Sequence, residues 1–147
     1  MIRVKIASPQ EVVPLDYAKL RETARVVLEG EDIAEAQISL AFVDNATIHG
    51  LNKRFLNHDE PTDVLSFPFS ARGAKSLEGE LVIGAEVAKV QAAERANDLS
   101  AELALYVIHG LLHLCGYDDH DDADTRRMRE RERHYLKLLA FPDIAES

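Results

Sequence analysis

Cysteine is almost absent from this sequence of 147 residues, in which Cys115 is the only one. An internal disulfide is therefore excluded, and such a chain fits a reducing compartment. No apolar run approaches the ~20 residues that a membrane-spanning helix requires. The opening residues, MIRVKIASPQ, also lack the apolar block of a signal peptide. From these absences we expect a cytoplasmic protein that does not enter a membrane.

Basic residues do not outnumber acidic ones in this sequence. The chain has 17 Lys and Arg residues against 26 Asp and Glu residues, and its formal net charge is −9. A protein that coats nucleic acid by charge alone must neutralise many phosphates, so this balance excludes that class. We therefore expect no DNA binding, while a local basic surface is still compatible with the composition.

The remaining composition is that of an ordinary globular protein, with 46% hydrophobic and 29% charged residues. The length corresponds to about one domain, and no repeat, low-complexity tract or linker divides it. We therefore expect residues 1–147 to form a single domain.

Strands and helices are expected to intermix along the chain. Alternating or short continuous apolar runs predict strands over residues 2–6, 38–42, 64–67 and 81–83. Helical spacing of apolar residues predicts helices over residues 15–29, 45–55, 85–96, 100–116 and 121–140. Residues 70–78 are expected to form a loop. This order predicts an α/β (α+β) fold with a roughly four-stranded mixed sheet and about five helices.

The segment AELALYVIHGLLHLC, residues 101–115, is apolar almost all round, so we expect a central, buried helix. His109 and His113 lie four residues apart in it, which places both imidazoles on one face. Burying two imidazoles without partners is costly, and this spacing lets both bind one metal ion at ~2.0–2.1 Å. The sequence therefore predicts that this helix binds a metal.

A turn after Gly116 allows a third ligand to return to the same ion, and His120 is within reach. Three protein ligands leave the fourth position of zinc to water, which is typical of catalytic zinc. We expect one Zn²⁺ per chain, held by His109, His113 and His120. Asp118 is the candidate catalytic carboxylate, or an acceptor for a hydrogen bond from a ligand imidazole.

A zinc peptidase of the HExxH type carries a glutamate base directly after its first histidine. Gly110 occupies that position here. We expect Gly110 to allow close packing of the helix, and the missing base argues against a peptidase.

Three motifs occur in the order PTDVLSFPF, GELVIG and HGLLHLCGYD. Together they resemble the YbeY family of bacterial endoribonucleases, over about residues 38–137. The resemblance implies a single-domain α/β protein with one zinc on three histidines. It also implies a cytoplasmic enzyme that cuts single-stranded ribosomal RNA, in rRNA maturation and quality control, with the small ribosomal subunit as its partner.

Two positions depart from the pattern of that family. Its third ligand directly follows the Asp of the GYD motif, where this chain has Asp119, so Asp119 competes with His120 for the role. Its active-site arginine corresponds to Leu56, two residues after Arg54. Because a loop absorbs one extra residue at little cost, we predict His120 as the third ligand.

Candidate contacts to RNA lie in two places. Arg54, and Thr62 and Asp63 at the start of PTDVLSF, are the predicted substrate-binding residues. The last predicted helix carries five arginines among acidic residues: Arg126, Arg127, Arg129, Arg131 and Arg133. This run is either a solvated face or a basic edge that touches phosphate.

Two other functions fit the same residues. One is a metallohydrolase that acts on peptide or amide bonds. The other is a non-catalytic ribosome assembly factor, in which zinc only ties the turn at Gly116 to the helix. RNA cleavage that is lost in His113→Ala distinguishes the nuclease from both.

Overall fold

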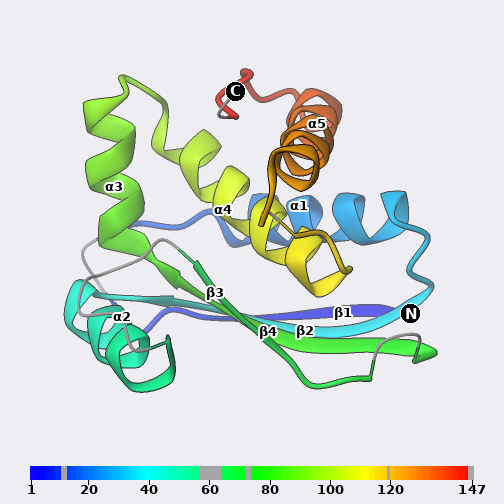
Figure 1. Cartoon of the computed structure of the whole chain (residues 1–147). Helices are drawn as coiled ribbons and strands as arrows, with labels where there is room; N and C mark the ends of the chain where they lie inside the picture. Colours follow the sequence, from blue (N-terminus) through cyan, green and yellow to red (C-terminus); the bar gives the residue numbers. More distant parts are fainter. Residues whose placement is uncertain (11–12, 57–63, 72–73, 119, 146–147) are drawn as a thin grey trace.

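The computed structural model describes residues 1–10, 13–56, 64–71, 74–118 and 120–145 (Figure 1). Its strands are β1 (Ile2–Ala7), β2 (Glu35–Val43), β3 (Val64–Pro68) and β4 (Ser76–Gly84). Its α-helices are α1 (Tyr17–Gly30), α2 (Asn45–Leu51), α3 (Ala85–Glu94), α4 (Leu99–Leu114) and α5 (Asp122–Leu138), and a π-helical turn, η1 (Asn52–Leu56), continues α2. The described residues therefore contain the expected strands and helices.

The four strands form one mixed sheet in the order β1-β2-β4-β3. β1 and β4 both pair in parallel with β2, and β3 pairs antiparallel with β4 at the edge. Helices α1, α4 and α5 lie over one face of the sheet, while α2 lies on the other side (Figure 1). This arrangement confirms the predicted single-domain α/β fold with a mixed sheet and five helices.

The expected loop over residues 70–78 is wrong at its end, because β4 begins at Ser76. The strand pairs with β2 along its whole length, from Glu35 opposite Ser76 to Val43 opposite Gly84. Gly79 interrupts the apolar pattern that would have shown the strand. A Cβ at that position would lie 3.0 Å from a methyl carbon of Leu114, so the glycine lets α4 approach the sheet.

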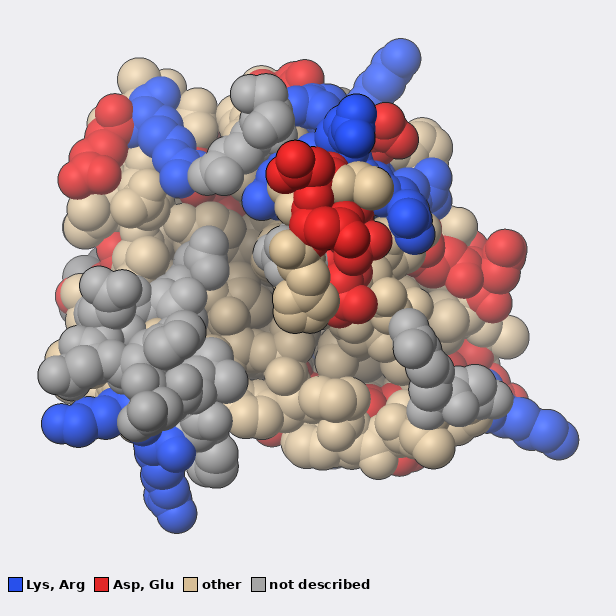
Figure 2. Space-filling view, viewed as in Figure 1, with Lys and Arg blue, Asp and Glu red and all other residues tan. Residues whose placement is uncertain are grey.

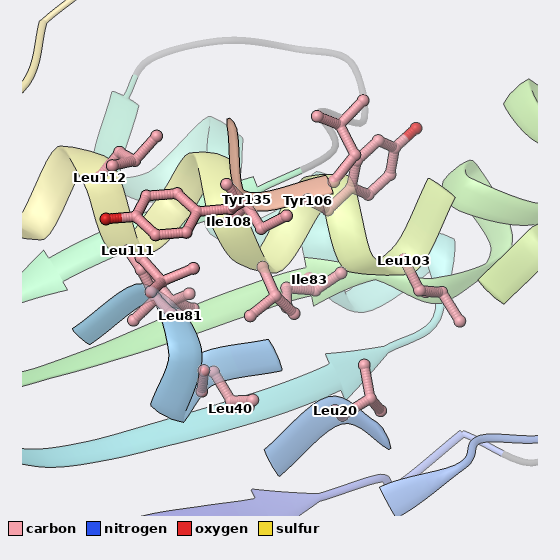
Figure 3. Packing of buried hydrophobic residues seen from close by; sticks show 14 of the residues in the cluster. Leu20, Leu40, Leu81, Ile83, Leu103, Tyr106, Ile108, Leu111, Leu112 and Tyr135 are labelled. Atoms are coloured by element: carbon pink, nitrogen blue, oxygen red, sulfur yellow. The ribbon is translucent and has the colours of Figure 1, made fainter. Parts of the chain in front are cut away.

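Helix α4 is the centre of the molecule, as its apolar sequence predicts. Every residue from Ala101 to Ile108 is buried, and the helix contacts α1, α3, α5, β3 and β4. Figure 3 shows Leu111 of α4 pointing toward Leu81 of the sheet, inside the main hydrophobic cluster. A helix enclosed on all sides can hold a polar side chain only where a partner is available.

Gly110 sets the distance between α4 and the sheet. A Cβ on this residue would lie 2.9 Å from the methyl carbons of Leu81 and 3.0 Å from Val64. The expected role of Gly110 in close helix packing is thereby confirmed. The side chain of Ser66 on β3 also donates to the Gly110 carbonyl at 3.4 Å.

On the opposite face, α2 covers a second, smaller hydrophobic cluster of Val43, Ile48, Leu65 and Val82. This cluster joins α2 to the part of the sheet where β3 and β4 pair. No helix within the described residues has both the length and the apolar character to cross a membrane.

Candidate metal centre

His109 and His113 lie side by side on α4 with their ring nitrogens converging. The two Nε2 atoms are 3.0 Å apart. The rings meet edge to face, with centroids 4.5 Å apart and an interplanar angle of 83°. The helical spacing of four residues therefore brings both imidazoles to one point, as the sequence predicts.

The other nitrogen of each ring has its own acceptor. His109 Nδ1 donates to Glu132 Oε2 at 2.7 Å, and His113 Nδ1 donates to the main-chain carbonyl of Tyr117 at 3.0 Å. Such a bond at Nδ1 places the lone pair on Nε2, which is how metal-binding histidines are usually oriented. Both rings are therefore held with Nε2 toward the shared point.

Gly116 produces the turn that brings the Tyr117 carbonyl back to His113. Its φ of 104° lies in the left-handed region that favours glycine. Two main-chain bonds close the end of α4: Gly116 N donates to His113 O and Tyr117 N to Leu112 O, each at 3.0 Å. This is the glycine C-cap expected from the sequence.

Glu132 of α5 is a buried carboxylate, with its side chain only 1% exposed. Arg129, one turn earlier on α5, donates to both of its oxygens, at 2.8 and 2.7 Å. The carboxylate thus lies between a guanidinium and the His109 imidazole. A buried charge requires partners of this kind, and removing the carboxylate would take one acceptor from each of the two neighbours.

The donor set formed by the two histidines fits zinc. Tetrahedral zinc with bonds of ~2.0–2.1 Å holds its ligand atoms about 3.3 Å apart, close to the 3.0 Å between the two Nε2 atoms. Within the described residues, however, no group of three His, Cys, Asp or Glu side chains is arranged to hold a metal. The structure therefore brings together two of the three predicted ligands.

His120 does not join the histidine pair in this structure. Its side chain is 81% exposed, and its Nε2 lies 3.7 Å from Oδ1 of Asp118. Asp118 is 54% exposed, and the Nδ1 atoms of His109 and His113 are bound instead to Glu132 and to the Tyr117 carbonyl. Asp119 lies outside the described residues. The third ligand and the catalytic role of Asp118 stay predictions.

The predicted substrate-binding residues are only partly described. Thr62 and Asp63 lie outside the described residues, and so does the side chain of Leu56. Arg54 is exposed on η1, the π-helical turn after α2. Its role in substrate binding therefore stays a prediction as well.

A groove of about 610 Å³ opens beside His113. One wall is the end of α4 together with Asp118, and another is the β3–β4 connection with Ser70 and Lys75. Cys115 also lines the groove. Burial is the main effect that raises the pKa of its thiol, to about 12, and the negative charge of Glu31 adds to it. Cys115 therefore stays protonated near neutral pH, consistent with a packing role.

The arginines of α5 mostly bind acidic neighbours. The pairs are Arg127–Asp124, Arg129–Glu132, Arg131–Glu31 and Arg133–Asp143, with N–O distances of 3.7, 2.7, 2.6 and 3.4 Å. Figure 2 accordingly shows acidic and basic side chains intermixed over this region rather than a continuous basic surface. The pairing favours structural roles for these arginines over a basic edge that touches phosphate.

Glu132 is the important site residue that sequence reasoning missed. It was hidden in the charge run of the last helix. Glu132 lies at helical spacing from Met128, Tyr135 and Leu136, which are buried on the same face of α5. This spacing is the sequence signal that could have identified it as buried. A single acid within an otherwise apolar helical face indicates a buried partner.

Comparison with known proteins identifies the family. The family model described as "Endoribonuclease YbeY" matches residues 5–140. The chain belongs to the endoribonuclease YbeY family. It is 38% identical to the "Endoribonuclease YbeY" of Pelotomaculum thermopropionicum over 146 residues, which cover 92% of this chain and 96% of the relative. It is also 38% identical to that of Chlorobium luteolum, over 85% of this chain and 90% of the relative.

A solved structure has the same fold as this YbeY-family chain. The solution structure of TM1509 from Thermotoga maritima has a TM-score of 0.63 and 30% sequence identity, covering 95% of this chain and 89% of that one. The resemblance that the three motifs carried is therefore confirmed. Membership of the YbeY family makes the chain a nuclease that cuts within RNA.

Proposed function

We propose that this YbeY-family chain is a zinc-dependent endoribonuclease specific for single strands. Its substrate is ribosomal RNA, and it acts in the cytoplasm in rRNA maturation and in quality control of the small ribosomal subunit. One observation carries the zinc dependence. Two imidazoles converge with their Nε2 atoms 3.0 Å apart, while a carboxylate and a carbonyl hold their Nδ1 atoms.

In this proposal His109, His113 and His120 hold one zinc ion. When bound, zinc supplies a Lewis acid for a phosphate oxygen and lowers the pKa of a water. Glu132 and the Tyr117 carbonyl accept hydrogen bonds from the Nδ1–H groups of His109 and His113. These bonds fix the tautomers of the two rings and make their Nε2 atoms more basic ligands. Asp118 lies in the groove wall. We propose that it accepts the proton of the hydroxyl, from a water or a ribose 2′-OH, that attacks the phosphate while the bond to the leaving oxygen breaks.

The groove beside His113 is the proposed path of the RNA. Lys75 lines it and offers a cation to phosphate, whereas the hydroxyl of Ser70 is bound to the main chain of Glu78. Arg54, Thr62 and Asp63 are proposed to contact the same strand. Because the net charge is −9, affinity must come from such local contacts or from a partner protein on the small subunit.

The test combines zinc analysis with cleavage of a single-stranded rRNA fragment. We expect about one zinc per chain in the wild type, and loss of both zinc and cleavage in His113→Ala. His134→Ala is the matched control, since His134 is an exposed histidine of α5. Wild-type protein that binds no zinc, or His113→Ala that cleaves like the wild type, contradicts the proposal.

The other two functions predict different results. A peptide or amide hydrolase needs a general base, and at the peptidase position Gly110 is packed against Leu81 without space for a larger side chain. Cleavage of peptides but not RNA would favour that function. If folded His113→Ala lacks zinc yet supports ribosome maturation, the chain is instead a non-catalytic assembly factor.

A further inference from the structure

The face of the sheet opposite α1, α4 and α5 is open over much of its area. Among the described elements, only α2 lies on that side (Figure 1), where it packs over Leu65 and Val82 at the β3–β4 pair. Beyond α2, the strand register places Arg3 of β1 level with Gln37 of β2, and Gln37 level with Glu78 of β4. Level residues of neighbouring strands point to the same face, so these side chains share the open surface.

Phe69 completes this row. The last pair of β3 and β4 is Pro68 opposite Gly79, so Phe69 comes level with Glu78. Its N–H donates to the Glu78 carbonyl at 2.8 Å, which continues the ladder one residue beyond β3. Phe69 is nevertheless 65% exposed. The backbone thus holds an aromatic ring at the surface, with much of its apolar area in contact with water.

A hollow of about 260 Å³ lies beside this ring on the open face. The neighbouring row adds a second cation to it, because Lys5 of β1 is level with Ser39 of β2. Six side chains line this sheet-face hollow: Arg3, Lys5, Gln37, Ser39, Phe69 and Glu78. The hollow therefore combines two exposed cations, an amide, a hydroxyl, an aromatic ring and one carboxylate.

These groups are those that bind a nucleotide of a single strand. Proteins that bind single-stranded RNA place cations along its phosphates and aromatic rings against its bases. The acids of this face, Glu78 and Glu80, both lie on β4, two strand spacings or about 9–10 Å from β1. Because carboxylates repel phosphate, the phosphate belongs over β1 and the base over Phe69.

The sheet-face hollow is continuous along the chain with the groove beside His113. Pro68 and Ser70 line the groove, whereas Phe69 between them lines the hollow. Successive side chains of an extended segment point to opposite sides, so this one segment borders both cavities. A strand that leaves the groove and passes around the β3–β4 connection meets the Phe69 ring.

We propose that the sheet-face hollow binds a nucleotide of single-stranded RNA outside the cut, with its phosphate on Arg3 and Lys5 and its base stacked on Phe69. The inference rests on the proposed function, in which the groove beside His113 is the path of the RNA. It extends that path to the opposite face of the sheet.

Phe69→Ala tests the stacking. The probe is a single-stranded rRNA fragment of about 12 nucleotides, within the usual range of site sizes, with 2′-O-methyl groups that resist cleavage. Fluorescence anisotropy should show affinity falling at least about fivefold, the lower end for loss of one stacked base. The salt dependence of binding should not change, because no charge is removed. An affinity equal to that of the wild type would overturn the proposal.

Tyr17→Ala is the matched aromatic control. Tyr17 is 45% exposed and lies on α1, over the other face of the sheet (Figure 1). We expect its RNA affinity to stay within about twofold of the wild type. Thermal unfolding should change little in either variant, since both rings are largely exposed. Equal losses of affinity in both variants would show a nonspecific effect and contradict the stacking on Phe69.

Lys5→Ala tests the phosphate contact. Removing one contact to a single strand should lower the logarithmic salt slope by about 0.7. Lys89→Ala, at an exposed position of α3, should leave the slope unchanged. If the slope of Lys5→Ala equals that of the wild type, no phosphate lies over β1 and the inference fails.

A second copy of this chain is the other occupant that the test can reveal. Sedimentation should show a monomer with and without the RNA fragment. A dimer of the wild type that dissociates in Phe69→Ala would instead show that a second copy covers the open face, and the assignment to RNA would be wrong.

The outcomes separate this inference from the proposed function. If the wild type binds no zinc, the proposed function fails, while the affinities of Phe69→Ala and Lys5→Ala still decide whether the hollow binds RNA. If His113→Ala loses zinc and cleavage but these two variants bind RNA like the wild type, the proposed function stands and the sheet-face hollow is excluded.

Discussion

Among single residues, Glu132 joins the candidate metal centre to the charged residues of α5. It is 1% exposed and lies between the Arg129 guanidinium and the His109 imidazole. Its carboxylate therefore has two functions that one substitution removes together. It neutralises a partly buried cation, and it orients the nitrogen that would bind metal.

Glu132→Ala should lower the free energy of unfolding by about 3 kcal/mol, because it removes the buried carboxylate that binds both the Arg129 guanidinium and the His109 imidazole. It should also weaken zinc binding about 10- to 100-fold, since His109 loses the acceptor at Nδ1. Denaturant unfolding and a zinc titration measure the two effects. Glu130→Ala, at an exposed position of the same helix, should change neither.

The third ligand is the other question at this scale. His120 is 81% exposed with its nearest acid 3.7 Å away, so little packing opposes its rotation toward the histidine pair. Three neutral imidazoles also keep more positive charge at the ion than two with a carboxylate, which makes a bound water more acidic. We therefore expect His120→Ala to lose zinc as severely as His113→Ala.

Asp119→Ala is the comparison for that ligand. It should keep most of the zinc affinity, measured in the same competition assay. If instead Asp119→Ala loses zinc and His120→Ala keeps it, the carboxylate at the position of the family's histidine is the ligand.

At the scale of elements, the position of α4 against the sheet depends on glycine. A Cβ on Gly110 would lie 2.9 Å from Leu81 and 3.0 Å from Val64, and a Cβ on Gly79 of β4 would lie 3.0 Å from Leu114. The two glycines, one on each element, let the face of α4 that carries Gly110 and Leu114 lie close to β3 and β4. The groove beside His113 forms at this junction.

Gly110→Ala should destabilise the protein by about 1–3 kcal/mol, the usual cost of an extra methyl in a packed core. Gly50→Ala is the matched control, because Gly50 lies in α2 with no atom within 4 Å of a Cβ. There the higher helix propensity of alanine should stabilise the protein by up to about 1 kcal/mol. Thermal unfolding of both variants compares them directly, and a stabilising Gly110→Ala would contradict the packing described.

For the whole molecule, the distribution of charge sets how RNA can bind. The net charge is −9, and most arginines of α5 bind acidic neighbours. Within the described residues, α5 therefore presents no long, continuous basic surface. Binding through the groove involves few phosphates, which limits its dependence on salt.

The proposed RNA complex should accordingly weaken only about 7- to 20-fold between 50 and 200 mM salt, as expected for two or three phosphate contacts on a single strand. Fluorescence anisotropy with a single-stranded rRNA fragment measures this. Lys75→Ala should reduce the logarithmic salt slope by about one, whereas Lys89→Ala, at an exposed position of α3, should not. A thousandfold loss would indicate an extended electrostatic interface instead.

Local patterns were sufficient to determine the elements and half of the site. Strand alternation, helical periodicity and the glycine after α4 depend on neighbours within a few residues, so the sequence alone predicted them. The pairing of His109 with His113 is of this kind, because helix geometry by itself places residues four apart on one face. The family was likewise recognisable from three short motifs.

Contacts between distant segments were decided only by the tertiary structure. Glu132 lies in a charge run that reads as a solvated face, and it becomes the partner of His109 only when α5 packs on α4. Glu31 meets Arg131 only because the end of α1 lies against α5. Burial turns these charges from solvated groups into obligatory partners, and burial is a property of packing between elements that local spacing does not encode.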